Sequence, residues 1–384
     1  MDPVELTRKL VSIPSYVENG RDERAIGEFI LNYLGDLGYL QVKKQEVEEG
    51  RSNIIAHDGY SPRLMFCCHM DTVSPSRGWK YDPFGGEIDG NHLYGLGAAD
   101  MKGGTASLLH ALISFHHTKG LWLLFDVDEE SYFKGMRAFL ERYEVRPELA
   151  VFPEPGLKIR NGHRGLIEIH FQVRGVTGHA SQPDEGKNSI WGATEAVKYL
   201  TERLQAREFS DPILGKSTCN LSFLMGGLCS EDEQECKTNI LKSPNRIPDI
   251  AEVVIDIRPA TKALNAQVAL DILNSYIVDS GFHLEKVEKK LDQGPLFVPR
   301  ERLGVLETVV KGVLGKVEYP ELDEYDKFGY TEAQMLNERL GINCVSFGPG
   351  PGEMAHGVDE YVSIDELGKA SEVYRMLIET YCST

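Results

Sequence analysis

Four short apolar runs along the chain each end in residues that can bind a divalent metal ion. Apolar runs of this length are typical of strands that are buried on both faces of a parallel sheet. In open α/β sheets, ligands bind beyond the carboxyl ends of the strands. We therefore expect side chains from distant parts of the chain to meet at one edge of one sheet. The runs and the groups that follow them are 64–68 with His69 and Asp71, 121–125 with Asp126 to Glu130, 149–152 with Glu154, and 344–347 with a glycine loop and His356.

Periodic apolar positions predict helices between these runs. Asp2 and Pro3 have the pattern of a helix N-cap and first helical position, and an apolar stripe from Ile26 to Leu37 predicts a second helix. Strands that alternate with helices are typical of an α/β fold of three layers, with the sheet between two layers of helices. Further elements are predicted as a strand at 53–57 and helices at 103–116, 133–143, 301–313, 331–339 and 365–381.

The pattern changes in the middle of the chain. Residues 167–173 alternate apolar and polar positions, which predicts a half-exposed strand. We expect a smaller α+β domain at 165–291, inserted into an α/β domain that is made of 1–164 and 292–384. A length of 384 residues also favours two domains. Other elements predicted for the inserted domain are strands near 221–224, 251–257 and 283–291, helices near 188–206 and 263–279, and loops at 211–215 and 226–237.

Composition and charge narrow the choice of partner. The hydrophobic fraction of 41% and the charged fraction of 26% are those of an ordinary globular protein. Lys and Arg total 41 against 59 Asp and Glu, and the resulting net charge of −18 argues against nucleic acid or an anionic membrane as the main partner. Seven cysteines without framework spacing, no signal-peptide pattern and no apolar stretch of about 20 residues predict a cytoplasmic protein.

His69 and Asp71 form the first motif with metal chemistry. At a strand end, side chains two residues apart lean to the same side, so the Asp71 carboxylate could orient the imidazole for a metal. Taken alone, the pair is better explained as a polar strand end.

The glycine-rich segment 95–104 holds the second motif. It has part of a dinucleotide-binding pattern, which would make the chain an oxidoreductase, but Asp100 stands where a pyrophosphate would have to bind. A carboxylate there is better suited to a cation, and its two oxygens could bridge two metal ions. The alternative is that Asp100 caps the helix predicted at 103–116.

Three further segments carry ligand-type side chains. Glu129 and Glu130 follow a strand end, where one could bind metal while the other acts as a base, and Asp126 and Asp128 beside them are expected in a solvated turn. Glu154 lies in a stiff Pro-Glu-Pro turn. His356 follows a glycine loop whose backbone can approach a ligand closely.

In this order, the motifs resemble those of the M20 metallopeptidase family, which includes two-zinc aminoacylases, deacetylases and carboxypeptidases. The matching segments are 69–75, 95–103, 128–130, 178–181 and 355–360. Within the family the chain is most similar to the acetylornithine deacetylase branch, through segments 79–84, 93–97, 245–247, 256–259, 330–333 and 347–350. Pro153 stands where the family commonly has Gly, and segment 226–237 matches no known motif.

The resemblance implies a di-zinc site with five ligands. His69 and Glu154 would hold one Zn²⁺, Glu130 and His356 would hold the other, and Asp100 would bridge both. Co²⁺ or Mn²⁺ could substitute for zinc.

The resemblance also implies roles beside the metals. Asp71 would orient His69, and Glu129 would be the general base for a metal-bound hydroxide that attacks an amide carbonyl. His179 would donate to the oxyanion, often across a homodimer in which the inserted domain serves as lid and dimerisation domain. Without the resemblance, His179 is best interpreted as an exposed turn histidine.

Three residues are candidates for binding the substrate. Arg258, together with Asn245, could bind a carboxylate, because the guanidinium fork matches a carboxylate; the alternative is a surface charge at a strand end. Glu332, which stands where many relatives outside the acetylornithine branch carry Asp, could meet a cationic side chain such as the ornithine amine.

The function expected from these motifs is the release of a free amino acid from an N-acyl amino acid, most similar to acetylornithine deacetylation. Within the family, a succinyl-diaminopimelate desuccinylase or a dipeptidase or carboxypeptidase remain alternatives. A catalytically silent binding protein that kept the fold is the alternative from a different class. The full set of ligand-type residues together with Glu129 argues against it.

Overall fold

The chain forms two compact units in the structure, which is a computed structural model and describes residues 1–383 apart from 19, 233–236, 326 and 328. Unit 1 comprises Met1–Asn161, Phe297–Pro320 and Thr331–Thr384. Unit 2 comprises Gly162–Leu296 and Glu321–Tyr330.

Unit 1 is built on a seven-stranded sheet in the order β1-β2-β6-β3-β7-β18-β8. Its four central strands are the apolar runs, and each pairs with its neighbour in parallel. The prediction of buried parallel strands at these runs is confirmed, and their carboxyl ends therefore lie at one edge. The strands are β1 (Gln41–Glu48), β2 (Arg51–His57), β6 (Leu121–Asp126), β3 (Leu64–His69), β7 (Leu149–Phe152), β18 (Asn343–Gly348) and β8 (Gly156–Arg160).

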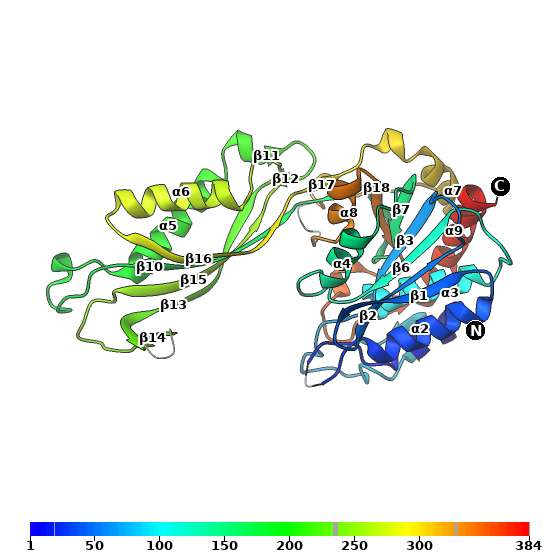
Figure 1. Cartoon of the computed structure of the whole chain (residues 1–384), viewed down its shortest axis with the longest axis horizontal. Coiled ribbons are helices and arrows are strands. Elements are labelled where there is room, and N and C mark those ends of the chain that lie inside the picture. The colour runs from blue at the N-terminus through cyan, green and yellow to red at the C-terminus, as the bar shows by residue number, and fades with distance from the viewer. Residues whose placement is uncertain (19, 233–236, 326, 328, 384) are drawn as a thin grey trace. The chain divides into compact units, whose positions relative to one another are not determined.

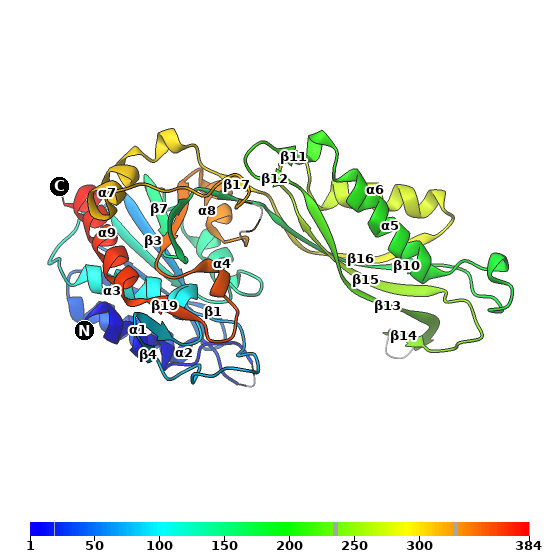
Figure 2. The ribbon, with the colours of Figure 1, turned by 180° about the vertical axis from the view of Figure 1, so that it is seen from behind.

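Helices cover both faces of this sheet (Figures 1 and 2). Asn53 and Ile54 are neighbours on β2, so their side chains point to opposite faces. The Asn53 amide donates to the Gly135 carbonyl of α4 at 2.8 Å, whereas Ile54 lies against Gly27 of α2. The predicted three-layer α/β fold is thus confirmed. The helices of unit 1 are α1 (Pro3–Val11), α2 (Arg24–Leu37), α3 (Gly103–Leu112), α4 (Lys134–Arg142), α7 (Gly304–Leu314), α8 (Ala333–Leu340) and α9 (Ile364–Cys382).

Several short elements surround the sheet of unit 1. The π-helical turn η1 (Ala98–Lys102) leads into α3. Strands β4 (Glu87–Asp89), β5 (His92–Tyr94) and β19 (Tyr361–Ser363) form a small separate sheet. Strand β1 was not predicted, because charged residues occupy half of its positions and Gln45 alone is buried. The remaining short elements of unit 1 are η4 (Arg300–Arg302) and η5 (Gly352–Met354). Strand β9 (Gly162–His163) belongs to unit 2, and β17 (Leu296–Phe297) spans the boundary between the units in the sequence.

Unit 2 is an antiparallel five-stranded sheet in the order β14-β13-β15-β10-β16. Helices α5 (Ser189–Arg203) and α6 (Ala266–Asp279) pack on one face of this sheet, as Figures 1 and 2 show. The inward residues of β10 and β15, such as Ile169 and Ile255, form the core with them. The strands are β10 (Leu166–Arg174), β13 (Thr218–Asp232), β14 (Lys237–Leu241), β15 (Ile250–Arg258) and β16 (His283–Gln293); shorter elements are η2 (Pro183–Glu185), η3 (Arg207–Phe209), β11 (Ser210–Asp211) and β12 (Gly215–Lys216).

The prediction of a loop at 226–237 is wrong for most of that segment. Residues 226–232 continue β13, and Lys237 begins β14, which pairs with it; residues 233–236 lie outside the described residues. Gly226 and Gly227 both lie within β13. Strand β13 pairs with β15 through these glycines and with β14 beyond them, and this pairing extends the strand.

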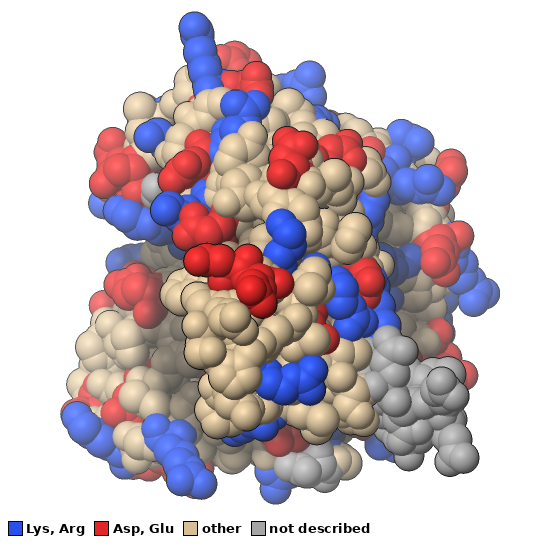
Figure 3. All heavy atoms as spheres, turned by 90° about the vertical axis from the view of Figure 1, so that its left-hand side faces the viewer, with Lys and Arg blue, Asp and Glu red and all other residues tan. Residues whose placement is uncertain are grey.

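Over the described residues, no helix is long and apolar enough to cross a membrane. On the face shown in Figure 3, acidic and basic side chains are interspersed. The net charge of −18 therefore does not form a single acidic field on that face.

Candidate metal centre

The predicted metal ligands of unit 1 lie where its strands end. His69 is the last residue of β3, Glu130 lies in the turn after β6, and Glu154 follows β7. His356 lies beyond β18, and Asp100 lies in η1, which leads into α3. Parallel pairing thus brings together side chains that are far apart in sequence.

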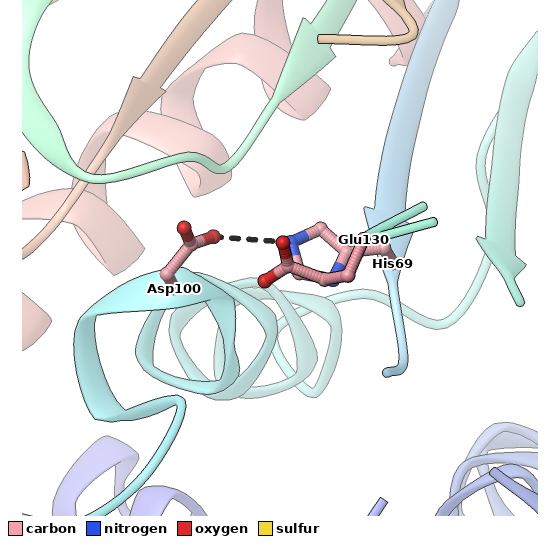
Figure 4. A group of neighbouring side chains, drawn as sticks. All are labelled: His69, Asp100 and Glu130. Carbon is pink, nitrogen blue, oxygen red and sulfur yellow. Dashed lines mark hydrogen bonds and ion pairs between the residues drawn. The ribbon is translucent and has the colours of Figure 1, made fainter. Parts of the chain in front are cut away.

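Asp100 is the centre of this group. One carboxylate oxygen, Oδ1, is 3.1 Å from Nε2 of His69, and the other, Oδ2, is 3.7 Å from Nε2 of His356. Figure 4 shows the carboxylate of Asp100 directed from its helical turn toward the imidazole at the end of β3, with Glu130 beside it. Each oxygen therefore faces a different histidine, which is the arrangement required of a bridging carboxylate.

The remaining ligands divide between the two histidines. Glu154 Oε1 is 3.8 Å from Nε2 of His69, whereas Glu130 Oε2 is 2.9 Å from Nε2 of His356. His69, Asp100 and Glu130 also have ligand atoms within 4.8 Å of one another. Imidazole and carboxylate are the donors of hydrolytic zinc sites. The donor set thus fits divalent cations.

Asp71 contacts both His69 and the backbone of the Glu129-Glu130 pair. Nδ1 of His69 is 3.0 Å from the backbone oxygen of Asp71 and 3.6 Å from its carboxylate. A hydrogen on Nδ1 leaves Nε2 free to face a cation. The Asp71 carboxylate also accepts the backbone N–H groups of Glu129 and Glu130, at 3.1 and 3.0 Å.

The site brings several buried carboxylates close together, an arrangement that bound positive charge would stabilise. Burial raises the pKa of Glu129 well above its ordinary value, and the nearby Glu130 and Glu154 carboxylates add to this rise. Burial likewise raises the pKa of Glu154 to about 8. Although burial opposes the imidazolium of His69, hydrogen bonds with Asp100 and Asp71 raise its pKa well above the ordinary value. Bound cations would relieve the repulsion among these carboxylates.

We expect zinc binding to release protons at neutral pH. The hydrogen bond with Glu130 raises the pKa of His356 to about 9, and burial raises that of Glu154 to about 8. Below these values both groups carry protons in the metal-free protein, and each must lose its proton to bind metal. Zinc affinity should therefore rise with pH and level off above the higher pKa. Calorimetric titration in two buffers of different ionisation enthalpy counts the protons released; none released at pH 7 would contradict this expectation.

The expectation that Asp126 and Asp128 lie in a solvated turn is wrong. Their residues are 0% and 3% exposed. Asp128 forms an ion pair with Arg51 at 3.0 Å, and burial raises the pKa of Asp126 to about 7. The strand end is covered by neighbouring elements, which residue type alone does not reveal.

Glu332 is buried and interacts with Asp126. Its residue is 1% exposed, and burial followed by the Asp126 charge raises its pKa well above the ordinary value. A carboxyl so enclosed has almost no surface on which to receive a substrate amine in this structure.

The other predicted site residues belong to unit 2. His179 is exposed, and Nδ1 contacts the Ser181 hydroxyl at 2.7 Å. The N–H of Ala180 donates to the backbone oxygen of Asn245, so His179 and Asn245 lie in adjoining loops. Arg258 is half-buried and holds Asp256 with two hydrogen bonds, at 2.7 and 3.0 Å. Its guanidinium already binds a carboxylate on its own strand.

Glu360 supports the site although no role was predicted for it. Its carboxylate accepts the backbone N–H groups of Gly97, Ala99 and Asp100 at 2.9, 2.9 and 3.0 Å. It thereby connects the turn that carries Asp100 to the segment that follows His356. Its position in the 355–360 motif could have indicated a role for Glu360, but only His356 of that motif was assigned one.

A profile of the peptidase family M20/M25/M40 matches residues 65–380. The chain belongs to this family. As a member, it is a hydrolase that acts on amide bonds. The predicted resemblance to M20 metallopeptidases is confirmed. Among curated relatives, the acetylornithine deacetylase of Photorhabdus laumondii is 28% identical over 402 residues, which cover 99% of this chain and 97% of the relative.

Solved structures show the same fold. A metallo-carboxypeptidase of the family from Sulfolobus solfataricus superposes with a TM-score of 0.76 at 17% identity, covering 99% of both chains. A Bacillus subtilis protein described as a dinuclear metal binding peptidase from the family superposes with a TM-score of 0.67 at 14% identity, covering 98% of both chains.

Proposed function

We propose that the protein is a two-zinc amidohydrolase that releases a free amino acid from an N-acyl amino acid. The observation that supports this most is Asp100, whose two oxygens face His69 and His356 at 3.1 and 3.7 Å. The names of the curated relatives support acetylornithine or a similar N-acetylated amino acid as the substrate.

In this proposal, His69, Glu154 and Asp100 would hold one zinc, and Glu130, His356 and Asp100 would hold the other. When bound, a pair of divalent cations supplies polarisation of the amide carbonyl and makes water acidic enough to attack near neutral pH. Asp71 holds the backbone of the two glutamates, and its own backbone oxygen fixes which nitrogen of His69 faces the site.

Glu129 is the proposed general base. It takes the proton of the attacking water and returns it to the leaving amine. Burial and the neighbouring carboxylates raise its pKa well above the ordinary value, so it holds a proton more readily than an exposed glutamate does. In metal-loaded protein, the added positive charge would oppose that rise.

Unit 2 has a supporting role in the proposal. The proposed domain boundaries are those expected from the sequence, 165–291 for the inserted domain and 1–164 with 292–384 for the catalytic domain; they differ from the two compact units at 162–164, 292–296 and 321–330. His179 would donate to the oxyanion, with Asn245 and Arg258 binding the substrate in a homodimer. The proposed location is the cytoplasm.

Zinc-loaded protein is expected to hydrolyse N-acetyl-ornithine faster than N-acetyl-lysine, N-acetyl-citrulline, succinyl-diaminopimelate or dipeptides. A chelator should abolish turnover, and added Zn²⁺ or Co²⁺ should restore it. Amino-acid release by each substrate, with and without chelator, is the measurement. Faster turnover of dipeptides would make the chain a peptidase, and faster turnover of the succinyl compound would make it a desuccinylase. Failure to bind metal at all would favour a binding protein.

A further inference from the structure

Two carboxylates hold three successive backbone N–H groups in the turn after β6. Asp128 N–H donates to Oε1 of Glu23 at 3.1 Å. The next two, of Glu129 and Glu130, donate to the two oxygens of Asp71 at 3.1 and 3.0 Å. The proposed base and the proposed ligand beside it are therefore placed through their backbone. Asp71 comes from the end of β3, and Glu23 from the residue before α2.

Arg51, at the start of β2, forms hydrogen bonds with both Glu23 and Asp128 and so supports this turn. Its guanidinium binds both oxygens of Glu23, with Nε at 2.7 Å and Nη2 at 2.6 Å. The same Nη2 donates to Oδ1 of Asp128 at 3.0 Å, and Nη1 donates to Glu48 at 2.6 Å. The polar contacts of Arg51 are with Glu23, Asp128 and Glu48, so it contacts the turn and not the proposed base or metal ligands.

The group is buried, so its charges are poorly screened. The side chains of Arg51, Glu23 and Asp128 are 8%, 1% and 4% exposed. A bidentate guanidinium fixes both distance and angle, whereas an ammonium group acts as a point charge. Substituting Lys for Arg51 would therefore keep the positive charge while removing the geometric constraint.

The conformation of Asp128 shows why the turn needs this support. Its φ of 70° lies in the left-handed region, which residues other than glycine adopt uncommonly and which aspartate adopts more readily than most. The Asp128 carboxylate accepts the N–H of Tyr132 at 3.2 Å, and its backbone oxygen accepts that of Phe133 at 2.7 Å. These bonds, with those to Glu23 and Arg51, over-determine a conformation that the backbone alone disfavours.

We propose that Arg51 and Glu23 are positioning residues, which aim the carboxylates of Glu129 and Glu130 by fixing the backbone of Asp128. The inference rests on the proposed function in that it takes Glu129 as the base and Glu130 as a metal ligand. Neither Arg51 nor Glu23 touches the reacting atoms. A small displacement of a catalytic group costs rate even when its chemistry is unchanged.

The test uses full-length, zinc-loaded protein and the variants Arg51→Lys and Glu23→Gln. Arg51→Met would leave buried carboxylates without a counter-charge and is prone to unfolding, so these two milder changes are preferred. We expect kcat to fall about 10- to 100-fold with KM within about threefold. Zinc affinity, measured by competition with a chromogenic chelator, should fall about 10-fold because Glu130 shares the turn. The double variant should lose little more than either single variant, because the two residues act as one unit.

Arg63→Lys is the matched control. It changes an exposed pair with Glu148, at 3.1 Å, in the same unit. We expect kcat, KM and zinc affinity to equal those of the parent protein. If the parent hydrolyses no amide in the panel, the proposed function fails, and zinc affinity alone then decides the positioning role. The inference is overturned if Arg51→Lys and Glu23→Gln lower only the melting temperature, with kcat and zinc affinity per folded chain within about twofold of the parent.

Discussion

Replacing Glu129 by Gln will lower kcat by roughly 10²- to 10⁴-fold, the range attributed to a general acid–base group. Gln has the same shape but cannot take up the proton of water. Glu129 is 8% exposed, and its backbone N–H is held by Asp71, so the substituted side chain should remain in place. Zinc content should stay near that of the parent, because Glu129 is not one of the proposed ligands. The measurements are kcat for the preferred N-acyl amino acid and zinc per chain on the same preparation.

Glu141→Gln, on the exposed side of α4, is the control for the same change of side-chain charge. It should leave both quantities unchanged. Near-normal turnover of Glu129→Gln with full zinc occupancy would rule out Glu129 as the base and transfer that role to another group. Loss of zinc in Glu129→Gln would instead make it a ligand.

The central sheet could be predicted from the sequence because its strands carry their own signal. Residues 64–69 are buried along their whole length, and so are 149–152, so neither needs a polar face. Chemistry-bearing residues directly follow these strands, and the parallel arrangement then requires them to share an edge. His69, Glu130 and Glu154 could therefore be grouped before any coordinates were known.

Asp100 depended on a different argument. It does not follow a strand of the central sheet but lies in η1. From local pattern alone, a helix cap was a serious alternative for Asp100, whereas the apolar run at 344–347 had already grouped His356 with the other strand-end residues. The motif resemblance implied the bridging role of Asp100, and the structure places its carboxylate near both histidines.

The role of Glu23 and Arg51 in supporting the turn after β6 could not be predicted, because in the sequence these two residues resemble ordinary surface charges. Glu23 and Arg51 are 28 positions apart and lie in segments rich in charged residues. Their burial arises only when α2, β2 and the turn after β6 pack together. A buried ion pair leaves no periodic pattern, whereas a buried strand does. The same reason explains why Asp126 and Asp128 were expected in solvent.

Replacing Asp100 by Asn will break the shared part of the metal centre. Asn keeps one carbonyl oxygen but loses the second oxygen and the negative charge, so it cannot serve both cations. Loss of a group that merely hydrogen-bonds to a metal ligand lowers metal affinity by roughly 10- to 100-fold. Loss of Asp100, a direct ligand, should therefore lower the affinity for at least one zinc by about 100-fold or more. Turnover should fall at least as far, since a two-metal site acts as a unit. Zinc per chain at fixed free Zn²⁺, measured by atomic emission, and kcat on the same sample are the readouts.

Asp36→Asn, at an exposed aspartate of α2, controls for the loss of one charge. Two zinc ions held with parental affinity in Asp100→Asn would show that no carboxylate is shared, and each histidine would then need a separate set of ligands.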